Sequence, residues 1–190
     1  MITALGYAVQ EPGAPLAPWE FQRREPGPND VQIEILYTGI CHTDLHQATN
    51  HWGGGIFPMV PGHEIVGRVT AVGEHVRTLK PGDFAGVGFL VDSDQQCLDC
   101  KEDHEQFCQA AVQTFNSWDP DTGEPTYGGY SDVIVVNEHF AVHVPDTADL
   151  AGTAPLLCAG ITMYSPLRRW NVGPGDRVGV IGHGGLGTSV

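Results

Sequence analysis

Basic residues are scarce in this chain of 190 residues. It carries nine lysines and arginines against 23 aspartates and glutamates, so its formal net charge is −14. Nucleic acids and anionic membranes are bound through clusters of basic side chains, and so few of them cannot form such a patch. We therefore expect no nucleic acid and no membrane among the partners.

Long apolar runs are also missing. No stretch reaches the ~20 apolar residues that a membrane-spanning helix needs. The opening MITALGYAVQ lacks the basic start and the unbroken apolar core of a secretory signal. The five cysteines are an odd number, which argues against a framework of disulfides. Together these absences predict a cytoplasmic protein whose cysteines bind metal or take part in catalysis.

Glycine and proline, by contrast, are plentiful, with 25 and 14 residues. Such a composition favours short strands joined by turns over a helical bundle. Alternating, β-branched segments predict strands over residues 31–40, 64–73, 130–136 and 140–145. The glycines within EIVGRVTAVG indicate bulges or tight bends. The sequence thus predicts a mostly β fold, in the form of a small irregular barrel.

The pattern becomes helical over residues 146–170. Asp146 or Thr147 is expected to cap the first helix, because both residue types favour that position. Pro155 and Pro166 are expected to divide the segment into shorter helices.

A dinucleotide-binding pattern follows this helical segment. RVGVIG predicts a buried parallel strand, and the glycine-rich GHGGLG comes directly after it, as a strand–loop–helix unit for a dinucleotide requires. We expect two domains, residues 1–147 and residues 148–190, the second being the truncated start of a Rossmann α/β domain. Residues 154–190 should expose apolar surface.

Three residues far apart in the chain form a candidate metal site. Cys41 follows a predicted strand, His63 lies at a tight Pro–Gly turn that opens the next strand, and Cys158 has apolar neighbours. Taken singly, each has an ordinary structural explanation, such as a small buried side chain for a cysteine. Together they make a Cys₂His set, which suits a catalytic zinc with one open position. The neighbouring Glu64 is expected to point to the opposite face of its strand.

A second candidate metal site lies in an acidic lobe at residues 91–110. Three cysteines there have the close spacing of structural zinc ligands: Cys97, Cys100 and Cys108. A structural zinc takes four ligands, and either Asp94 or His104 could supply the fourth. Carboxylate is an acceptable zinc ligand but a harder one than thiolate. The alternative is a lobe with three free thiols and no metal.

Six stretches of the chain, taken together, match the pattern of a known family. They are GICHTDLHQ, FPMVPGHEIVGRV, KPGDFAGVG, GGYSDVIVV, APLLCAGITMYSPLRRW and VGVIGHGGLG. Through them the chain resembles the zinc-dependent medium-chain alcohol dehydrogenases, most closely the cinnamyl alcohol dehydrogenase-like branch. The resemblance implies a GroES-like catalytic barrel followed by a nucleotide-binding domain. It also implies an oxidoreductase that interconverts primary alcohols and aldehydes with a nicotinamide coenzyme, NADP(H) rather than NAD(H).

The resemblance further implies roles for particular residues. Thr43 and His46 match a relay that passes a proton between substrate and solvent, and Trp52 matches a residue of the substrate pocket. The implied catalytic zinc ligands are Cys41, His63 and Cys158, with Glu64 as a carboxylate that can approach the metal. The implied structural zinc ligands are Asp94, Cys97, Cys100 and Cys108. The implied coenzyme contacts are His42, Thr162, Gly182, His183, Gly184, Gly185, Leu186 and Gly187.

The chain departs from the family pattern in two residues and in length. Asp94 stands where the structural lobe of the family has the first of four cysteines, and His183 replaces an apolar residue of the glycine loop. The residue that selects NAD or NADP normally lies ~20 positions past that loop, and no such position follows here. Two hypotheses remain. One is an N-terminal portion of a dehydrogenase that works with a complementing C-terminal portion or as a homodimer. The other is a truncated, non-catalytic zinc-binding module.

Overall fold

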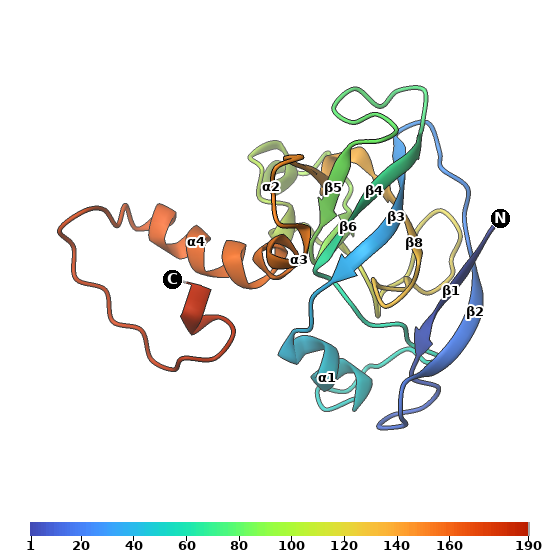
Figure 1. Ribbon diagram of the computed structural model, residues 1–190, viewed down its shortest axis with the longest axis horizontal. Helices are drawn as coiled ribbons and strands as arrows, with labels where there is room; N and C mark the ends of the chain where they lie inside the picture. Colours follow the sequence, from blue (N-terminus) through green and yellow to red (C-terminus); the bar gives the residue numbers. More distant parts are fainter. Residues whose placement is uncertain (190) are drawn as a thin grey trace.

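A five-stranded antiparallel sheet lies at the centre of the computed structural model, in the order β8–β3–β4–β5–β9 (Figure 1). Its strands are β3 (Asp30–Thr38), β4 (Ile65–Val72), β5 (Phe84–Val87), β8 (Val133–Asn137) and β9 (Ala141–Val144). The structure describes residues 1–189, so Val190, at the end of the expected second domain, lies outside it. The sheet confirms the predicted mostly β fold and the strands expected near residues 31, 64, 130 and 140.

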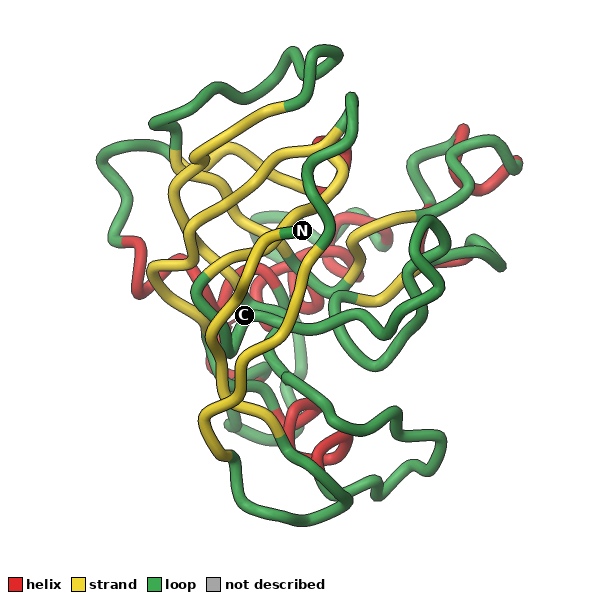
Figure 2. The backbone as a smooth tube through the Cα atoms, turned by 90° about the vertical axis from the view of Figure 1, so that its right-hand side faces the viewer, coloured by secondary structure: helices red, strands yellow, loops and turns green. Residues whose placement is uncertain are grey.

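Two smaller sheets flank the central one. The first pairs β1 (Ile2–Ala8) with β2 (Ala17–Arg23), and the second pairs β6 (Leu90–Asp92) with β7 (Val112–Gln113). Between β6 and β7 the chain forms the cysteine-rich lobe, which contains the short helices α2 (Leu98–Lys101) and η1 (Glu105–Phe107). Figure 2 shows that long loops connect many of the strands.

The main core is formed by the inward-facing residues of the central sheet. Val31 and Ile33 alternate with more exposed neighbours in β3, and they pack with β-branched side chains of the other strands and with Leu79 of the loop between β4 and β5. The pairing of β3 with β4 shifts register in two places, between Gln32 and Ile33 and between Ile35 and Tyr37. The bulges that the glycines of EIVGRVTAVG predict are therefore present. Gly67 faces the backbone of Glu34 so closely that a Cβ would overlap it.

The helical segment begins later than expected. Its elements are α3 (Leu150–Thr153), η3 (Ala154–Leu157) and α4 (Ala159–Arg169). The predicted N-caps Asp146 and Thr147 are wrong, because Asp149 takes the N-cap position of α3. The backbone that follows β9 first turns at Pro145, whose carbonyl accepts from the N–H of Ala148.

The two prolines of the helical segment behave differently. Pro155 lies in η3 and separates α3 from α4, as expected. Pro166 lies inside α4 and does not divide it, so that prediction is wrong. Proline removes the N–H that would bond to the carbonyl four residues earlier. Thr162 and Pro166 are both exposed, so water can satisfy that carbonyl and the helix continues.

The buried strand predicted from RVGVIG does not form. Residues 177–182 are irregular, and the side chain of Ile181 is fully exposed. A parallel strand needs hydrogen-bonding neighbours, and this segment pairs with none of residues 1–189. The expected exposure of apolar surface is confirmed over the described part of residues 154–190. Its large exposed apolar side chains are Leu156, Ile161, Tyr164, Trp170, Val172, Val178, Ile181 and Leu186.

The longest helix of residues 1–189 is α4, with 11 residues. No single helix there is both long and apolar enough to cross a bilayer. One bent pair of helical segments, Leu150–Leu157 and Ala159–Arg169, is long and apolar enough only when both parts are counted together. The axes of the two parts differ by 55°.

Candidate metal centres

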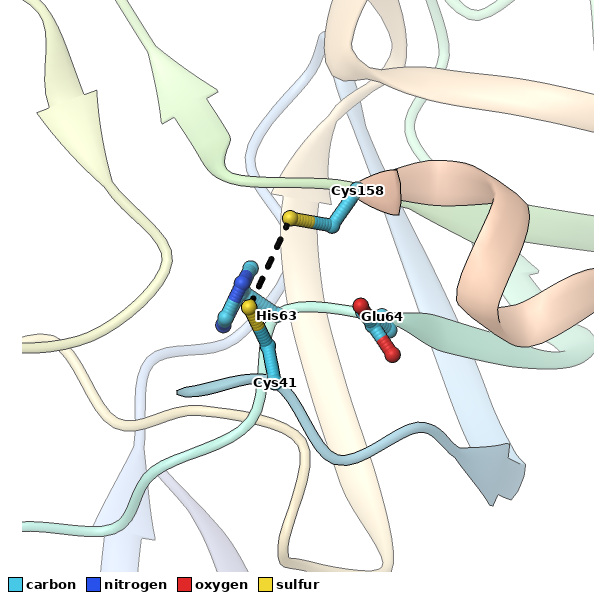
Figure 3. Close-up of side chains that lie close together, drawn as sticks. All are labelled: Cys41, His63, Glu64 and Cys158. Atoms are coloured by element: carbon cyan, nitrogen blue, oxygen red, sulfur yellow. Dashed lines mark hydrogen bonds between the residues drawn. The ribbon is translucent and has the colours of Figure 1, made fainter. Parts of the chain in front are cut away.

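Four potential ligands from three separate segments converge beside the central sheet (Figure 3). Cys41 follows β3, His63 and Glu64 directly precede β4, and Cys158 is the N-cap residue of α4. One ligand atom of each lies within 4.8 Å of those of the others. The structure thus brings together the residues that the sequence singled out, across 117 residues of chain between the two cysteines.

The two sulfurs have the spacing of metal ligands. Cys41 Sγ lies 3.9 Å from Cys158 Sγ. A disulfide bond would require ~2.05 Å. Two sulfurs at the corners of a tetrahedron with metal–sulfur bonds of ~2.3 Å lie ~3.8 Å apart. The observed separation therefore suits a shared zinc ion.

Glu64 belongs to the same cluster. The expectation that it points to the face opposite His63 is wrong, because its carboxylate oxygen lies among the other ligand atoms. Alternation between faces applies within a strand, and β4 begins only at Ile65. Burial is the first cause that raises the pKa of Glu64, with Asp44 acting in the same direction against the opposing effect of His63.

A buried carboxylate that sequence reasoning did not assign a role holds the two ligand segments together. Asp44 is the third residue of α1 (His42–Ala48), and its Oδ2 accepts from the N–H of Cys41 at 2.8 Å. Its Oδ1 accepts from the N–H of Gly62 at 2.9 Å and lies 3.1 Å from Nδ1 of His63. The signal was present in the sequence, since an acidic residue three positions after a helix N-cap is the spacing of a capping box.

The other nitrogen of His63 has no partner. His63 is fully buried, and its Nε2 makes no hydrogen bond. Buried polar atoms are nearly always hydrogen-bonded, so such an atom indicates a missing ligand. Burial opposes a charge on His63, but Asp44 and Cys158 outweigh burial and raise the pKa of His63 to about 10. The pocket thus favours a positive charge at the point where a metal ion would lie, and the donor set fits zinc.

The surroundings of Cys41 favour the thiolate form of its side chain. Burial raises the pKa of its thiol, but hydrogen bonds from the backbone and side chain of Thr43 and the presence of His63 outweigh that effect and lower it. Zinc binds the thiolate rather than the thiol, so a lowered pKa favours metal binding at neutral pH.

The lobe between β6 and β7 holds the second group of candidate ligands. Asp94, Cys97, Cys100 and Cys108 each place a ligand atom within 4.8 Å of the others. The alternative fourth ligand, His104, is not in this group, and its Nδ1 faces Glu102 at 3.9 Å instead.

Backbone hydrogen bonds shape the lobe. The carboxylate of Asp94 accepts from the N–H groups of Cys97 and Gln96, which lowers the pKa of Asp94. Ser93 lowers the pKa of Cys100, but burial and the neighbouring acidic groups of the cluster outweigh it and raise that pKa to about 12. Several acidic groups lie close together here, and they repel one another when they are charged. A bound dication would relieve that repulsion.

The residues expected to relay protons and line the pocket gather at α1. The ring of His46 lies 5.0 Å from that of His42 and 4.6 Å from that of Trp52, between centroids. Thr43 is the second residue of α1, two positions after Cys41. Trp52 is 58% exposed. His42, Thr43 and His46 therefore lie on the helix that begins at the first metal centre.

Apart from His42 on α1, the expected coenzyme contacts lie on α4 and beyond it. Thr162 is one turn after Cys158, because its N–H donates to the carbonyl of Cys158 at 3.0 Å. The glycine loop, residues 182–187, is almost wholly exposed and leads into the short helix η4 (Gly187–Ser189). Figure 1 shows α4 and the segment after it projecting from the β body.

The central antiparallel sheet, the Cys–His–Cys cluster before α4 and the four-ligand lobe together have the architecture of the GroES-like domain of alcohol dehydrogenases. The family model for the alcohol dehydrogenase GroES-like domain matches residues 27–146, and the chain belongs to this family.

Individual relatives agree with this family. The aldehyde reductase YahK of Escherichia coli (strain K12) is 55% identical over 188 residues, which are 98% of this chain and 53% of that protein. A cinnamyl alcohol dehydrogenase of Sorghum bicolor superposes with a TM-score of 0.96 at 47% identity, over 99% of this chain and 54% of that one. The Helicobacter pylori CAD complexed with NADP(H) has a TM-score of 0.97 and 47% identity, over 99% and 55%. The chain thus spans about half the length of the relatives it matches.

Proposed function

We propose that this chain supplies the zinc-binding catalytic domain of an oxidoreductase that interconverts aldehydes and primary alcohols with NADP(H). The observation that carries the proposal is the buried, unpartnered Nε2 of His63 beside the sulfurs of Cys41 and Cys158. The names of the relatives support the reaction class, and the NADP(H) complex of the Helicobacter pylori protein supports the coenzyme.

A zinc ion bound by Cys41, His63 and Cys158 would polarise a substrate carbonyl and stabilise the alkoxide formed by hydride transfer. Asp44 orients His63, and Glu64 lies beside the ligand atoms. We assign the Thr43 hydroxyl to hold the substrate proton and His46 to exchange it with solvent.

Coenzyme binding is assigned to the end of the chain and to α1. The residues proposed to contact NADP(H) are His42, Thr162, Gly182, His183, Gly184, Gly185, Leu186 and Gly187. Glycines let the backbone approach a pyrophosphate, and the free N–H groups at a helix start bind its oxygens. Trp52 is proposed to line the substrate pocket. We further propose domains at residues 1–147 and 148–190.

A structural zinc site is proposed in the lobe at residues 91–110. Its four ligands would be Asp94, Cys97, Cys100 and Cys108. A zinc ion bound there would hold the segment between β6 and β7 in place, since that segment contains little regular structure of its own.

Cobalt substitution tests both metal sites without requiring turnover. The chain should bind two Co²⁺ ions with sulfur-to-cobalt charge-transfer absorption, one for each cluster. The double variant Cys41→Ser, Cys158→Ser should lose one ion, and the matched control Cys97→Ser, Cys100→Ser should lose the other. Retention of both ions in the first variant would contradict the assignment of the catalytic ligands.

A zinc-binding module without turnover is the second candidate function. The irregular, exposed residues 177–182 favour it, because a coenzyme loop needs a sheet behind it. Fluorescence titration of the zinc-loaded chain with NADPH and then NADH separates the candidates. Saturable NADPH binding with aldehyde-dependent oxidation supports the enzyme, and no binding by a folded, zinc-loaded chain supports the module.

A further inference from the structure

Two histidines meet at the C-terminal end of α1, one in its last turn and one just after it. The Nδ1 atom of His46 lies 2.9 Å from the Nδ1 atom of His51. His51 is exposed and His46 is half-buried, so both rings can reach ions in solution. Neither side chain belongs to the two sulfur-containing clusters.

The backbone fixes this contact. Thr49 is the C-cap of α1, and Asn50 has a positive φ of 53°. The N–H of His51 donates to the carbonyl of His46 at 2.8 Å, and the N–H of Asn50 donates to the carbonyl of Gln47 at 2.9 Å. These two bonds form a Schellman motif, in which the side chains at the positions of His46 and His51 normally make an apolar contact.

Here the motif places two metal-binding side chains where an apolar pair is usual. Two nitrogens 2.9 Å apart subtend ~90° at an ion held by bonds of ~2.0–2.1 Å. A tetrahedral ion would need nitrogens ~3.3 Å apart. A right angle between two nitrogen ligands is the tetragonal geometry of Cu²⁺ and Ni²⁺.

We propose that His46 and His51 form a surface binding site for a tetragonal divalent ion of the Cu²⁺ or Ni²⁺ type. The ion replaces the proton shared by the two Nδ1 atoms, and water completes its coordination. The ring of His42, 5.0 Å from that of His46, lies close enough to offer a further imidazole. The site does not depend on the proposed function, since its ligands are the chain's own imidazoles.

The first test is calorimetric titration of the untagged chain, loaded with zinc beforehand, with NiCl₂. Ni²⁺ is the probe because it does not oxidise the thiols. We expect one ion to bind, with affinity at least tenfold weaker in His51→Asn and in His46→Asn. The matched control His75→Asn changes an exposed histidine elsewhere and should bind as the unmodified chain does. Equal affinity in the unmodified chain and His51→Asn would overturn the proposal.

The second test uses tryptophan emission. The ring of Trp52 lies 4.6 Å from that of His46, so bound Ni²⁺ should quench Trp52 among the four tryptophans. Trp52→Phe should remove most of the quenching and keep the calorimetric binding. Zinc released in proportion to added Ni²⁺, equally in His51→Asn, would place the ion at the thiolate clusters and refute the site. Loss of the cobalt spectra described above would instead refute the proposed function.

Discussion

Nδ1 of His63 lies 3.1 Å from Oδ1 of Asp44, and both side chains are buried. The same carboxylate accepts from the N–H groups of Cys41 and Gly62. One side chain thus sets the orientation of a proposed imidazole ligand and the path of the backbone at a proposed thiolate ligand. Because Asp44 engages Nδ1 of His63, Nε2 is the nitrogen that remains free for a metal ion.

Asp44→Asn should weaken both the metal centre and the fold. An amide has one oxygen acceptor where the carboxylate serves three donors, so at least one buried donor loses its partner. We expect zinc affinity at this cluster to fall by about 10- to 100-fold, and the free energy of unfolding to fall by about 3 kcal/mol. Chelator competition and urea unfolding measure the two effects.

The exposed Asp146 provides the control for this variant, since Asp146→Asn removes a carboxylate without a buried donor. It should change neither quantity. If Asp44→Asn retains zinc as firmly as the control does, Asp44 does not position His63.

Gly39→Ala should displace Glu64. A Cβ at residue 39 would overlap the carboxylate of Glu64, so that side chain must leave the cluster. We expect the free energy of unfolding to fall by about 2 kcal/mol and metal affinity at the catalytic cluster to fall about tenfold. Gly173→Ala is the control, because a Cβ there meets open space.

A double variant shows whether Glu64 is the cause. In a Glu64→Ala background, Gly39→Ala should cost much less stability than it does alone, because the overlapping side chain is gone. Costs that simply add would mean that the strain at Gly39 arises elsewhere.

Asp94→Cys should tighten metal retention in the lobe at residues 91–110. The substitution replaces a carboxylate with the softer thiolate that zinc prefers beside Cys97, Cys100 and Cys108. The rate of zinc release to a chelator should fall. Asp99→Cys, which adds a cysteine to α2 outside the ligand group, is the matched control. An unchanged release rate in Asp94→Cys would show that residue 94 is not a ligand position.

The strands of the central sheet and the membership of both clusters could be predicted from the sequence. Apolar and polar residues alternate along β3 and β4 because one face of the sheet is buried. This pattern can be recognised from neighbouring residues alone. The residue types at Cys41, His63 and Cys158 also indicate metal binding, because thiolate and imidazole are ligands of zinc. Convergence of these segments is a property of the whole sheet, however. The contacts of Asp44 with Gly62 and His63 likewise appeared only with the fold, although the capping-box spacing of Asp44 can be read from the sequence.

The failed predictions share a physical cause, since each applied a local rule that depends on the surroundings. RVGVIG has the composition of a buried strand but has no neighbour to pair with among residues 1–189. Pro166 lacks a donor, yet it lies on an exposed face where water replaces the bond. Glu64 was placed by strand alternation one residue before the strand begins.

Glu138→Gln should make the fold less stable at neutral pH and remove part of its acid sensitivity. Oε2 of Glu138 accepts from the N–H groups of Arg77 and Thr78 and from the Thr78 hydroxyl. Burial raises the pKa of Glu138, but these bonds outweigh it and lower the pKa below its usual range. A lowered pKa in the folded state gives stability that is complete above the unfolded pKa and is lost as pH falls through the folded value. Unfolding by urea at pH 7 should therefore show a loss of about 1 kcal/mol, which disappears below pH ~3. Glu20→Gln, at an exposed residue of β2, should show neither effect, and a loss that stays constant down to pH ~3 would show that the charge of Glu138 is not its source.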